Sequence, residues 1–167
     1  MVPVSVLDHV AVLDTGARIE VPAAPVTRPV TGQPPEPTPP SSPAGGAENL
    51  VRVPLGRIAH ARSGDKGPNS NVGFWTGERV WPWLRSALTT ELLRRLYPGA
   101  AGLRIERHEF PNLRAVHFVL HGALDEGAAS NGRPDIAGKA IGEFLPARLV
   151  DVPVDLVPPE FRPGAGR

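Results

Sequence analysis

Residues 79–97, with the sequence RVWPWLRSALTTELLRRLY, decide the fold of this 167-residue chain. The apolar side chains of this stretch recur at three- and four-residue spacing: Val80, Trp83, Leu84, Ala87, Leu88, Leu92, Leu93 and Leu96. That spacing predicts one amphipathic helix. Pro82 suits its first turn, and Pro98-Gly99 ends it.

The segments on either side of this helix have the features of strands. They are rich in apolar residues and are bounded by glycine and proline. Six further elements are predicted: strands over 51–59, 71–75, 103–110, 115–121 and 148–156, and a shorter helix over 136–145. The order is β-β-α-β-β-α-β, in which the first two strands are separate or form one bent element. An α+β, ferredoxin-like sandwich, with two helices on one face of an antiparallel sheet, satisfies this order.

Four regions are expected along the chain. They are an N-terminal β-ribbon arm over 1–21, a proline-rich linker over 22–49, the ferredoxin-like domain over 50–157 and a flexible tail over 158–167. The arm is predicted from apolar runs at 4–7, 10–13 and 18–21, and such a ribbon needs a surface to cover. That surface is either the body of this chain or another protein. The linker is expected to be a polyproline-like spacer, although a proline-ligand role stays open.

Composition narrows the function classes. The chain has no run of eighteen apolar residues and no signal-peptide pattern, so it is expected to be cytoplasmic and without a membrane partner. The absence of cysteine excludes disulfides, thiol nucleophiles and thiolate metal sites. The net charge is +1 and aromatic residues make up 5% of the chain, without a basic cluster, so nucleic acid is not an expected partner.

The two lysines, Lys66 and Lys139, are candidate functional residues. All sixteen other basic residues, histidine apart, are arginine, as in a composition that uses arginine wherever a generic charge is enough. The lysines that remain are then expected to be needed for their compact ammonium. Both lie in polar, glycine-containing segments, SGDKG at 63–67 and DIAGK at 135–139.

Residues 60–71, HARSGDKGPNSN, are predicted to be a polar, glycine-rich loop. Backbone N–H groups freed by glycine, with the charges of Arg62 and Lys66, suit a carboxylate or phosphate. The loop is not a Walker motif, because Asp65 and Gly67 flank the lysine. The alternative is a rigid connection in which Asp65 caps backbone donors and pairs with Arg62 or Lys66.

Three further polar residues are candidates. Asn112 lies in a Pro-Asn-Leu turn, where a structural role is favoured. His117 and His121 are four residues apart, so a strand places both on one face. No third ligand has a suitable spacing, and a metal site is not expected. His121, beside Gly122, is the predicted general base.

Several motifs in chain order resemble one known family. They are ARSGDKG at 61–67, NVG at 71–73, PNL at 111–113, FVL at 118–120, GAL at 122–124 and DIAGK at 135–139. Together they resemble the C-terminal domain of the acyclic terpene utilisation protein (AtuA) family. The resemblance implies a ferredoxin-like fold. In many relatives this module follows a larger domain linked to the catabolism of branched or terpenoid acyl-CoA compounds.

The resemblance implies a free-standing small subunit that assembles with a large AtuA-type subunit as a hetero-oligomer. The implied ligand is an acyl-CoA or related carboxylic acid, with hydratase, dehydratase or other lyase chemistry and no cofactor. The predicted catalytic residues are Asp65, Lys66 and His121. The predicted substrate-binding residues are Arg62, Ser63, Asn69, Asn71, Asn112 and Lys139. The alternative function is a noncatalytic protein-interaction module whose glycine loops are structural.

Overall fold

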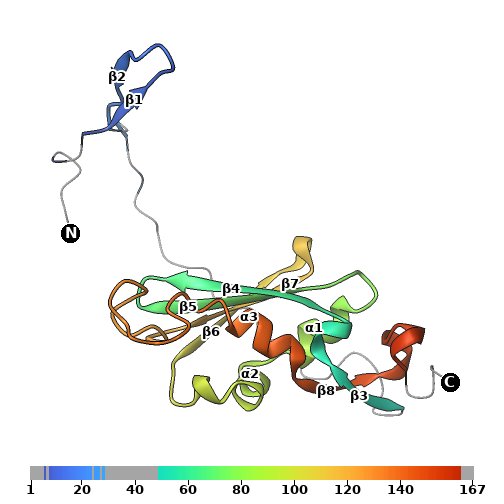
Figure 1. The fold of residues 1–167 in the computed structure, drawn as a ribbon. Coiled ribbons are helices and arrows are strands. Elements are labelled where there is room, and N and C mark those ends of the chain that lie inside the picture. Colours follow the sequence, from blue (N-terminus) through green and yellow to red (C-terminus); the bar gives the residue numbers. More distant parts are fainter. Residues whose placement is uncertain (1–5, 7, 24, 27, 29–48, 163–167) are drawn as a thin grey trace. The chain divides into compact units, whose positions relative to one another are not determined.

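The structure is a computed structural model that describes residues 6, 8–23, 25–26, 28 and 49–162. The chain divides into two units, Met1–Pro35 and Glu36–Arg167. The first unit contains an antiparallel hairpin of β1 (Val10–Val12) and β2 (Arg18–Glu20) (Figure 1). These strands confirm the predictions over 10–13 and 18–21. Apart from Val6, the strand predicted over 4–7 lies outside the described residues, as do most of the linker and half of the tail.

The second unit contains a four-stranded antiparallel sheet covered by three helices. The sheet has the order β4-β5-β7-β6, and a separate two-stranded ribbon pairs β3 with β8. In chain order the elements are β3 (Leu50–Pro54), β4 (His60–Lys66), β5 (Asn69–Trp75), α1 (Trp81–Ala87), α2 (Thr90–Leu96), β6 (Ile105–Phe110), β7 (Ala115–Leu120), α3 (Ile141–Phe144) and β8 (Leu149–Pro153). The three helices lie on the same side of the larger sheet (Figure 1).

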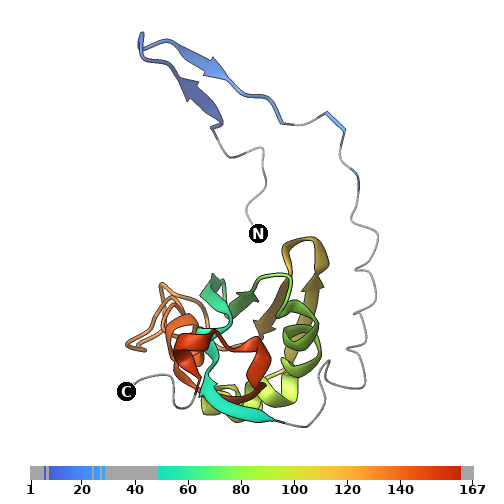
Figure 2. The ribbon, with the colours of Figure 1, turned by 90° about the vertical axis from the view of Figure 1, so that its right-hand side faces the viewer.

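The predicted ferredoxin-like class is confirmed by the way the central strands connect. Strands β5 and β6 run in the same direction and are linked by α1 and α2, while β7 lies between them and is antiparallel to both. This is a split βαβ unit. The strand arrangement differs from the simple sandwich at one edge of the sheet. The edge next to β5 is taken by β4, and the strand after α3 pairs with β3 on the helix side of the sheet (Figure 2).

The prediction of a loop over 60–71 is wrong, because this segment is a β-hairpin. Strands β4 and β5 pair from His60 opposite Trp75 to Lys66 opposite Asn69, and only Gly67 and Pro68 form the turn. Gly67 has φ 64°, which suits glycine. Pairing of β5 with β7 and burial of alternate side chains outweigh the low strand propensity of glycine, serine and aspartate.

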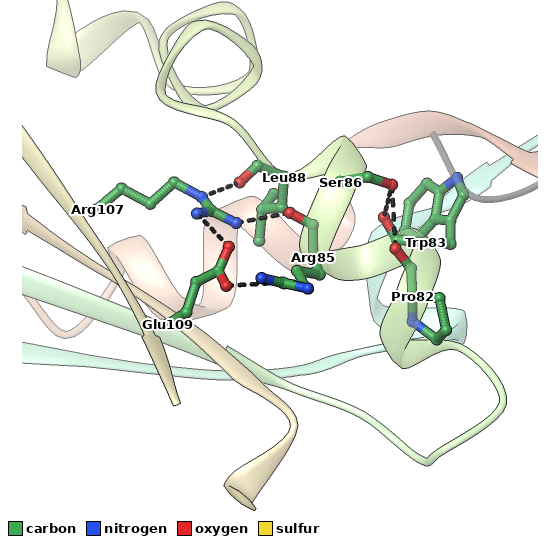
Figure 3. Close-up of polar contacts among 7 residues, drawn as sticks. All are labelled: Pro82, Trp83, Arg85, Ser86, Leu88, Arg107 and Glu109. Carbon is green, nitrogen blue, oxygen red and sulfur yellow. Dashed lines mark hydrogen bonds and ion pairs between the residues drawn. The ribbon is translucent and has the colours of Figure 1, made fainter. Parts of the chain in front are cut away.

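The single helix predicted over 79–97 is two helices, α1 and α2, with a break at Leu88 and Thr89. The hydroxyl of Thr89 accepts a hydrogen bond of 3.1 Å from the backbone N–H of Leu92, so Thr89 caps the start of α2. The end of α1 is held by Arg107 of β6. Its guanidinium donates to the carbonyls of Leu88 at 2.9 Å and Arg85 at 2.6 Å (Figure 3). These carbonyls would have no partner at a free helix end.

Arg107 also belongs to a buried ion-pair network. It is 3% exposed, and its Nη1 lies 2.8 Å from Oε1 of Glu109. The second carboxylate oxygen of Glu109 accepts from Nε of Arg85 on α1 at 2.7 Å (Figure 3). The network therefore fastens the end of α1 to β6 through charge-assisted hydrogen bonds.

Helix α3 begins five residues later than predicted, because Asp135 organises the segment before it. The carboxylate of Asp135 accepts from the backbone N–H groups of Lys139 at 2.8 Å and Ala140 at 2.9 Å. Gly142 then packs against β4, where an added Cβ would lie 2.7 Å from the backbone nitrogen of Ser63. A side chain at this position would push α3 away from the sheet.

One hydrophobic core fills the space between the sheet, the helices and the β3–β8 ribbon. Its largest fully buried side chains are Phe74, Phe118, Leu55, Leu84, Leu88, Leu93, Leu120 and Leu145. None of the helices in the part of the chain that the structure describes combines the length and apolar character needed to span a bilayer.

Candidate binding site on the open face of the sheet

The larger sheet has one face packed on the helices and one open face. Alternation along β5 turns Val72 and Phe74 toward the helices. Asn71, Gly73 and Trp75 therefore lie on the opposite face, which no helix of the described residues covers. We refer to this face, formed by β4, β5, β7 and β6, as the open face.

An open cavity of about 380 Å³ lies at the β4 edge of the larger sheet and extends over β4 and β5 on the open face. Its lining combines three cationic side chains, one carboxylate, an amide, an imidazole and an indole: Arg62, Ser63, Gly64, Asp65, Lys66, Asn71, Gly73, Trp75, His117 and Lys139. Six of the nine predicted site residues are therefore brought together. The excess of cations over carboxylates favours an anionic ligand.

The basic side chains of the cavity form no ion pair with a carboxylate of the described residues. Lys66 donates from Nζ to the backbone carbonyl of Asp65 at 2.8 Å. Among the described residues, no ion pair joins Asp65 to Arg62 or Lys66, so the predicted salt bridge within this segment is not formed. Lys139 likewise has no carboxylate partner in that part of the chain. All three positive charges are accessible to a ligand.

His117 lies in the cavity as a neutral ring at neutral pH. Burial lowers its pKa below the usual 6.5, and repulsion by His108 and Lys66 acts in the same direction. Its Nε2 lies 2.7 Å from Nδ2 of Asn71. With the amide nitrogen as donor, Nε2 accepts and the ring proton resides on Nδ1. The ring can then donate one hydrogen bond from Nδ1.

The amide oxygen of Asn71 is a buried acceptor without a donor among the described residues. Buried polar atoms are nearly always hydrogen-bonded, so an acceptor of this kind needs an explanation. This oxygen has almost no exposed surface, so it is an unsatisfied acceptor beneath the cavity that Asn71 lines.

Aromatic side chains extend the open face beyond the cavity. His60 and Trp75 stack with ring centroids 5.6 Å apart, and Phe110 meets His117 edge to face at 6.1 Å. Trp75 is 41% exposed and Phe110 is 46% exposed. Exposed aromatic rings of this kind are enriched at protein interfaces.

Four predicted site residues have their side chains engaged elsewhere or lie outside the cavity. The hydroxyl of Ser63, although the residue lines the cavity, donates to the carbonyls of Gly138 and Lys139 and accepts from the N–H of Gly142. It anchors the segment that leads into α3. The other three do not line the cavity: Nε2 of His121 lies 3.2 Å from Glu106, Oδ1 of Asn69 accepts from the N–H of Gly122, and Asn112 lies in the exposed β6–β7 turn.

Sequence reasoning did not assign a role to Trp75, and it placed the general base at His121 rather than His117, although Trp75 and His117 both line the cavity. Trp75 could have been identified from the sequence. Asn71, Gly73 and Trp75 alternate along one strand, so they share one face of it. His117 was placed on the same face as His121, and only the three-dimensional contacts separate the two. Within the described residues, no group of three or more histidine, aspartate and glutamate side chains is placed to share a metal ion.

Comparison with known protein families gave a match over most of the second unit. The family model of the AtuA ferredoxin-like domain matches residues 53–151, which include every strand of the larger sheet and all three helices. No curated protein and no solved structure matched the chain.

Proposed function

Because the chain belongs to the AtuA ferredoxin-like domain family, we propose that it is a small subunit of an enzyme assembled with a larger AtuA-type partner. In this proposal the open face meets the partner, and its cavity completes a site for an acyl-CoA or related carboxylic acid in the cytoplasm. The observation that carries the proposal is the accessible group of three cations beside a neutral imidazole.

The proposed roles follow from the chemistry of each side chain. Arg62, Lys66 and Lys139 hold the carboxylate or phosphate of the ligand, since each carries positive charge without a carboxylate partner among the described residues. His117 donates a hydrogen bond from Nδ1, and Asp65 accepts a proton. Addition or removal of water across a carbon–carbon double bond requires such a donor and acceptor. In this scheme His117 replaces His121, which lies outside the cavity.

Two exposed apolar surfaces support association with a partner. One is formed by Trp75 and Phe110 on the open face. The other is the face of the β1–β2 hairpin that carries Ile19 and Val21, which are 51% and 48% exposed. A two-stranded hairpin has little stability alone, so a partner that covers its apolar face would stabilise it.

Native mass spectrometry of the tagged chain, purified from its own host, tests this proposal. A complex with a larger AtuA-type protein is the expected result. Phe110→Ser is expected to lower the yield of that complex, while Leu149→Ser, which changes a similarly exposed side chain away from the open face, leaves the yield unchanged. A homo-oligomer or monomer without a larger companion would contradict the subunit proposal.

A second candidate is a noncatalytic interaction module, and the packing of Gly142 favours it. This glycine, like Gly138, is required by the close approach of its segment to β4 and β5, so its presence needs no ligand. Thermal unfolding of the assembled complex with and without butyryl-CoA separates the candidates. A ligand that binds the folded state raises the melting temperature. No shift for the assembled complex would favour the interaction module.

A further inference from the structure

A second and larger cavity lies on the helix side of the sheet, apart from the open face. It has a volume of about 880 Å³ and is lined by α1, α2, the β3–β8 ribbon and the turn before β8. The lining residues come from both ends of the domain: Arg52, Trp83, Ser86, Ala87, Leu92, Arg95, Leu96, Ala147, Arg148, Leu149, Val150 and Asp151. This volume lies in the range of small-molecule sites. None of these residues belongs to the open-face cavity.

The inner part of this cavity is apolar. Trp83, Leu96 and Val150 are 4%, 8% and 5% exposed, and Leu92 packs beside them. Trp83 lies on the side of α1 away from Arg107 (Figure 3), so its ring takes no part in the Arg107 network. An apolar group of a ligand that entered here would be removed from water, which is favourable.

Trp83 lines this cavity and is 4% exposed, so its indole ring forms part of the inner wall. The neighbouring hydroxyl of Ser86 donates within α1, to the carbonyls of Pro82 and Trp83 (Figure 3). The Trp83 ring therefore reports on the cavity, because a ligand that enters it changes the surroundings of the indole.

The rim of the cavity is cationic. Arg52, Arg95 and Arg148 line it together with a single carboxylate, Asp151, which lies opposite Arg52 in the β3–β8 register. No ion pair among the described residues involves Arg52 or Arg95. Arg148 has its guanidinium 5.0 Å from the ring centroid of Phe144. Asp151 can balance one of these charges, which leaves an excess of positive charge above the apolar wall.

We propose that this cavity is a second ligand site, specific for an amphipathic carboxylate with one anionic head and an apolar body. The guanidinium of Arg95, with those of Arg52 and Arg148, meets the carboxylate. The apolar body lies against Trp83, Leu92, Leu96 and Val150. The proposal does not depend on the function assigned to the open face.

The three tryptophans of the chain give a direct test. The full chain, labelled with ¹⁵N, shows one indole N–H resonance for each, and Trp75→Phe and Trp81→Phe identify the Trp83 signal by elimination. Titration with decanoate is expected to shift the Trp83 resonance to saturation. Arg95→Gln is expected to weaken this binding at least about tenfold, because it removes a charge-assisted contact. Arg79→Gln, an exposed arginine outside the cavity, is the matched control and leaves the affinity unchanged.

Three results would overturn the proposal. The first is a decanoate titration in which the Trp83 signal does not move, or only the Trp75 signal of the open face does. The second is an equal shift of the Trp83 signal by decyltrimethylammonium, which has the same apolar chain and the opposite charge. The third is equal affinity of the Arg95→Gln and Arg79→Gln variants for decanoate. Lys66→Ala, on the open face, is expected to leave decanoate binding at Trp83 unchanged.

Discussion

Lys66 can be tested separately from the fold, because its side chain is exposed and its one hydrogen bond is to the neighbouring backbone. Lys66→Ala is expected to weaken binding of butyryl-CoA to the assembled complex at least about tenfold, since it removes a charge-assisted contact to the anion. Isothermal calorimetry measures this affinity. Urea unfolding of the variant is expected to match that of the unchanged chain.

The matched control is Arg79→Ala, which removes an exposed positive charge outside the open-face cavity. It is expected to leave butyryl-CoA affinity unchanged. Equal affinity of the Lys66→Ala complex and the unchanged complex would remove Lys66 from the proposed site. Equal losses in both variants would indicate that net charge, rather than a specific contact, attracts the ligand.

His117 is expected to make the domain less stable as pH falls. Burial, and then the charges of His108 and Lys66, lower its folded-state pKa below the usual 6.5. The unfolded chain therefore binds a proton at His117 more readily than the folded chain, so stability falls as pH drops below about 6.5 and levels off below the folded-state pKa. Urea unfolding at a series of pH values measures this slope.

His117→Gln is expected to reduce the acid-dependent loss of stability, since glutamine does not titrate. The comparison is between the variant and the unchanged chain, in the slope of unfolding free energy against pH. An unchanged slope would show that His117 is not the group responsible.

The candidate site shows how far single residues could be predicted from the sequence. Polar segments at 60–71 and 135–139 were recognised, and the fold brings Arg62, Lys66 and Lys139 to one cavity. His121 was predicted as the general base, whereas His117 is the histidine that lines the cavity. His121 and His117 share a face in any strand, but only the contact with Glu106 shows that His121 lies outside the cavity. A contact between strands cannot be predicted from the spacing of residues along one strand.

At the scale of elements, the Arg107 network is expected to be essential for stability. Arg107→Leu leaves Glu109 without one of its two arginine partners and leaves the carbonyls at the end of α1 without a donor. Removing one partner of a buried ion pair costs about 3–5 kcal/mol. Arg107→Lys is also expected to destabilise the domain, because one ammonium cannot reproduce the planar guanidinium contacts.

The matched control is Arg104→Ala on the open side of the same strand region. Arg104 pairs with Glu106, but its side chain is 72% exposed. Exposed pairs contribute about 0–1 kcal/mol, so this variant is expected to unfold at nearly the same urea concentration as the unchanged chain. Similar losses for Arg104→Ala and Arg107→Leu would contradict a special role for the buried network.

Gly142→Ala tests the packing of α3 on β4. The new Cβ would lie 2.7 Å from the backbone nitrogen of Ser63, so the helix or the strand must shift. Overpacking of this kind costs about 1–3 kcal/mol, which urea unfolding measures. Gly77→Ala is the control, because its Cβ would meet no atom within 4 Å. A Gly142→Ala variant as stable as Gly77→Ala would show that α3 packs less closely than described.

The same contacts explain which elements could be predicted. The 3.6-residue periodicity correctly identified helical structure over 79–97, but the break at Leu88 depends partly on Arg107, which is distant in sequence. The β4–β5 hairpin was not predicted, because Ser63, Gly64 and Asp65 are residue types that are typical of loops. Their pairing partners lie in β5, and β5 is itself paired with β7. Local propensity describes a segment alone, whereas these strands depend on their neighbours.

At the scale of the whole molecule, the second unit is expected to fold without the first. Within the described residues, the buried side chains of its core lie between Val53 and Val157. A chain of residues 49–167 is therefore expected to unfold at the same urea concentration as the full chain, and its ¹⁵N spectrum is expected to show dispersed signals. Loss of cooperative unfolding in this fragment would show that the first 48 residues contribute to the fold.

The pairing of β3 with β8 has a consequence for how this domain is shared among proteins. Leu50 lies opposite Pro153, so the strand that opens the domain and the strand that closes it run side by side. Both limits of the family match, 53 and 151, fall within this ribbon. A module whose two ends emerge at one place can be inserted into another polypeptide, or circularly permuted, without distorting its interior. Gene fusion and gene splitting are therefore structurally simple steps for this domain.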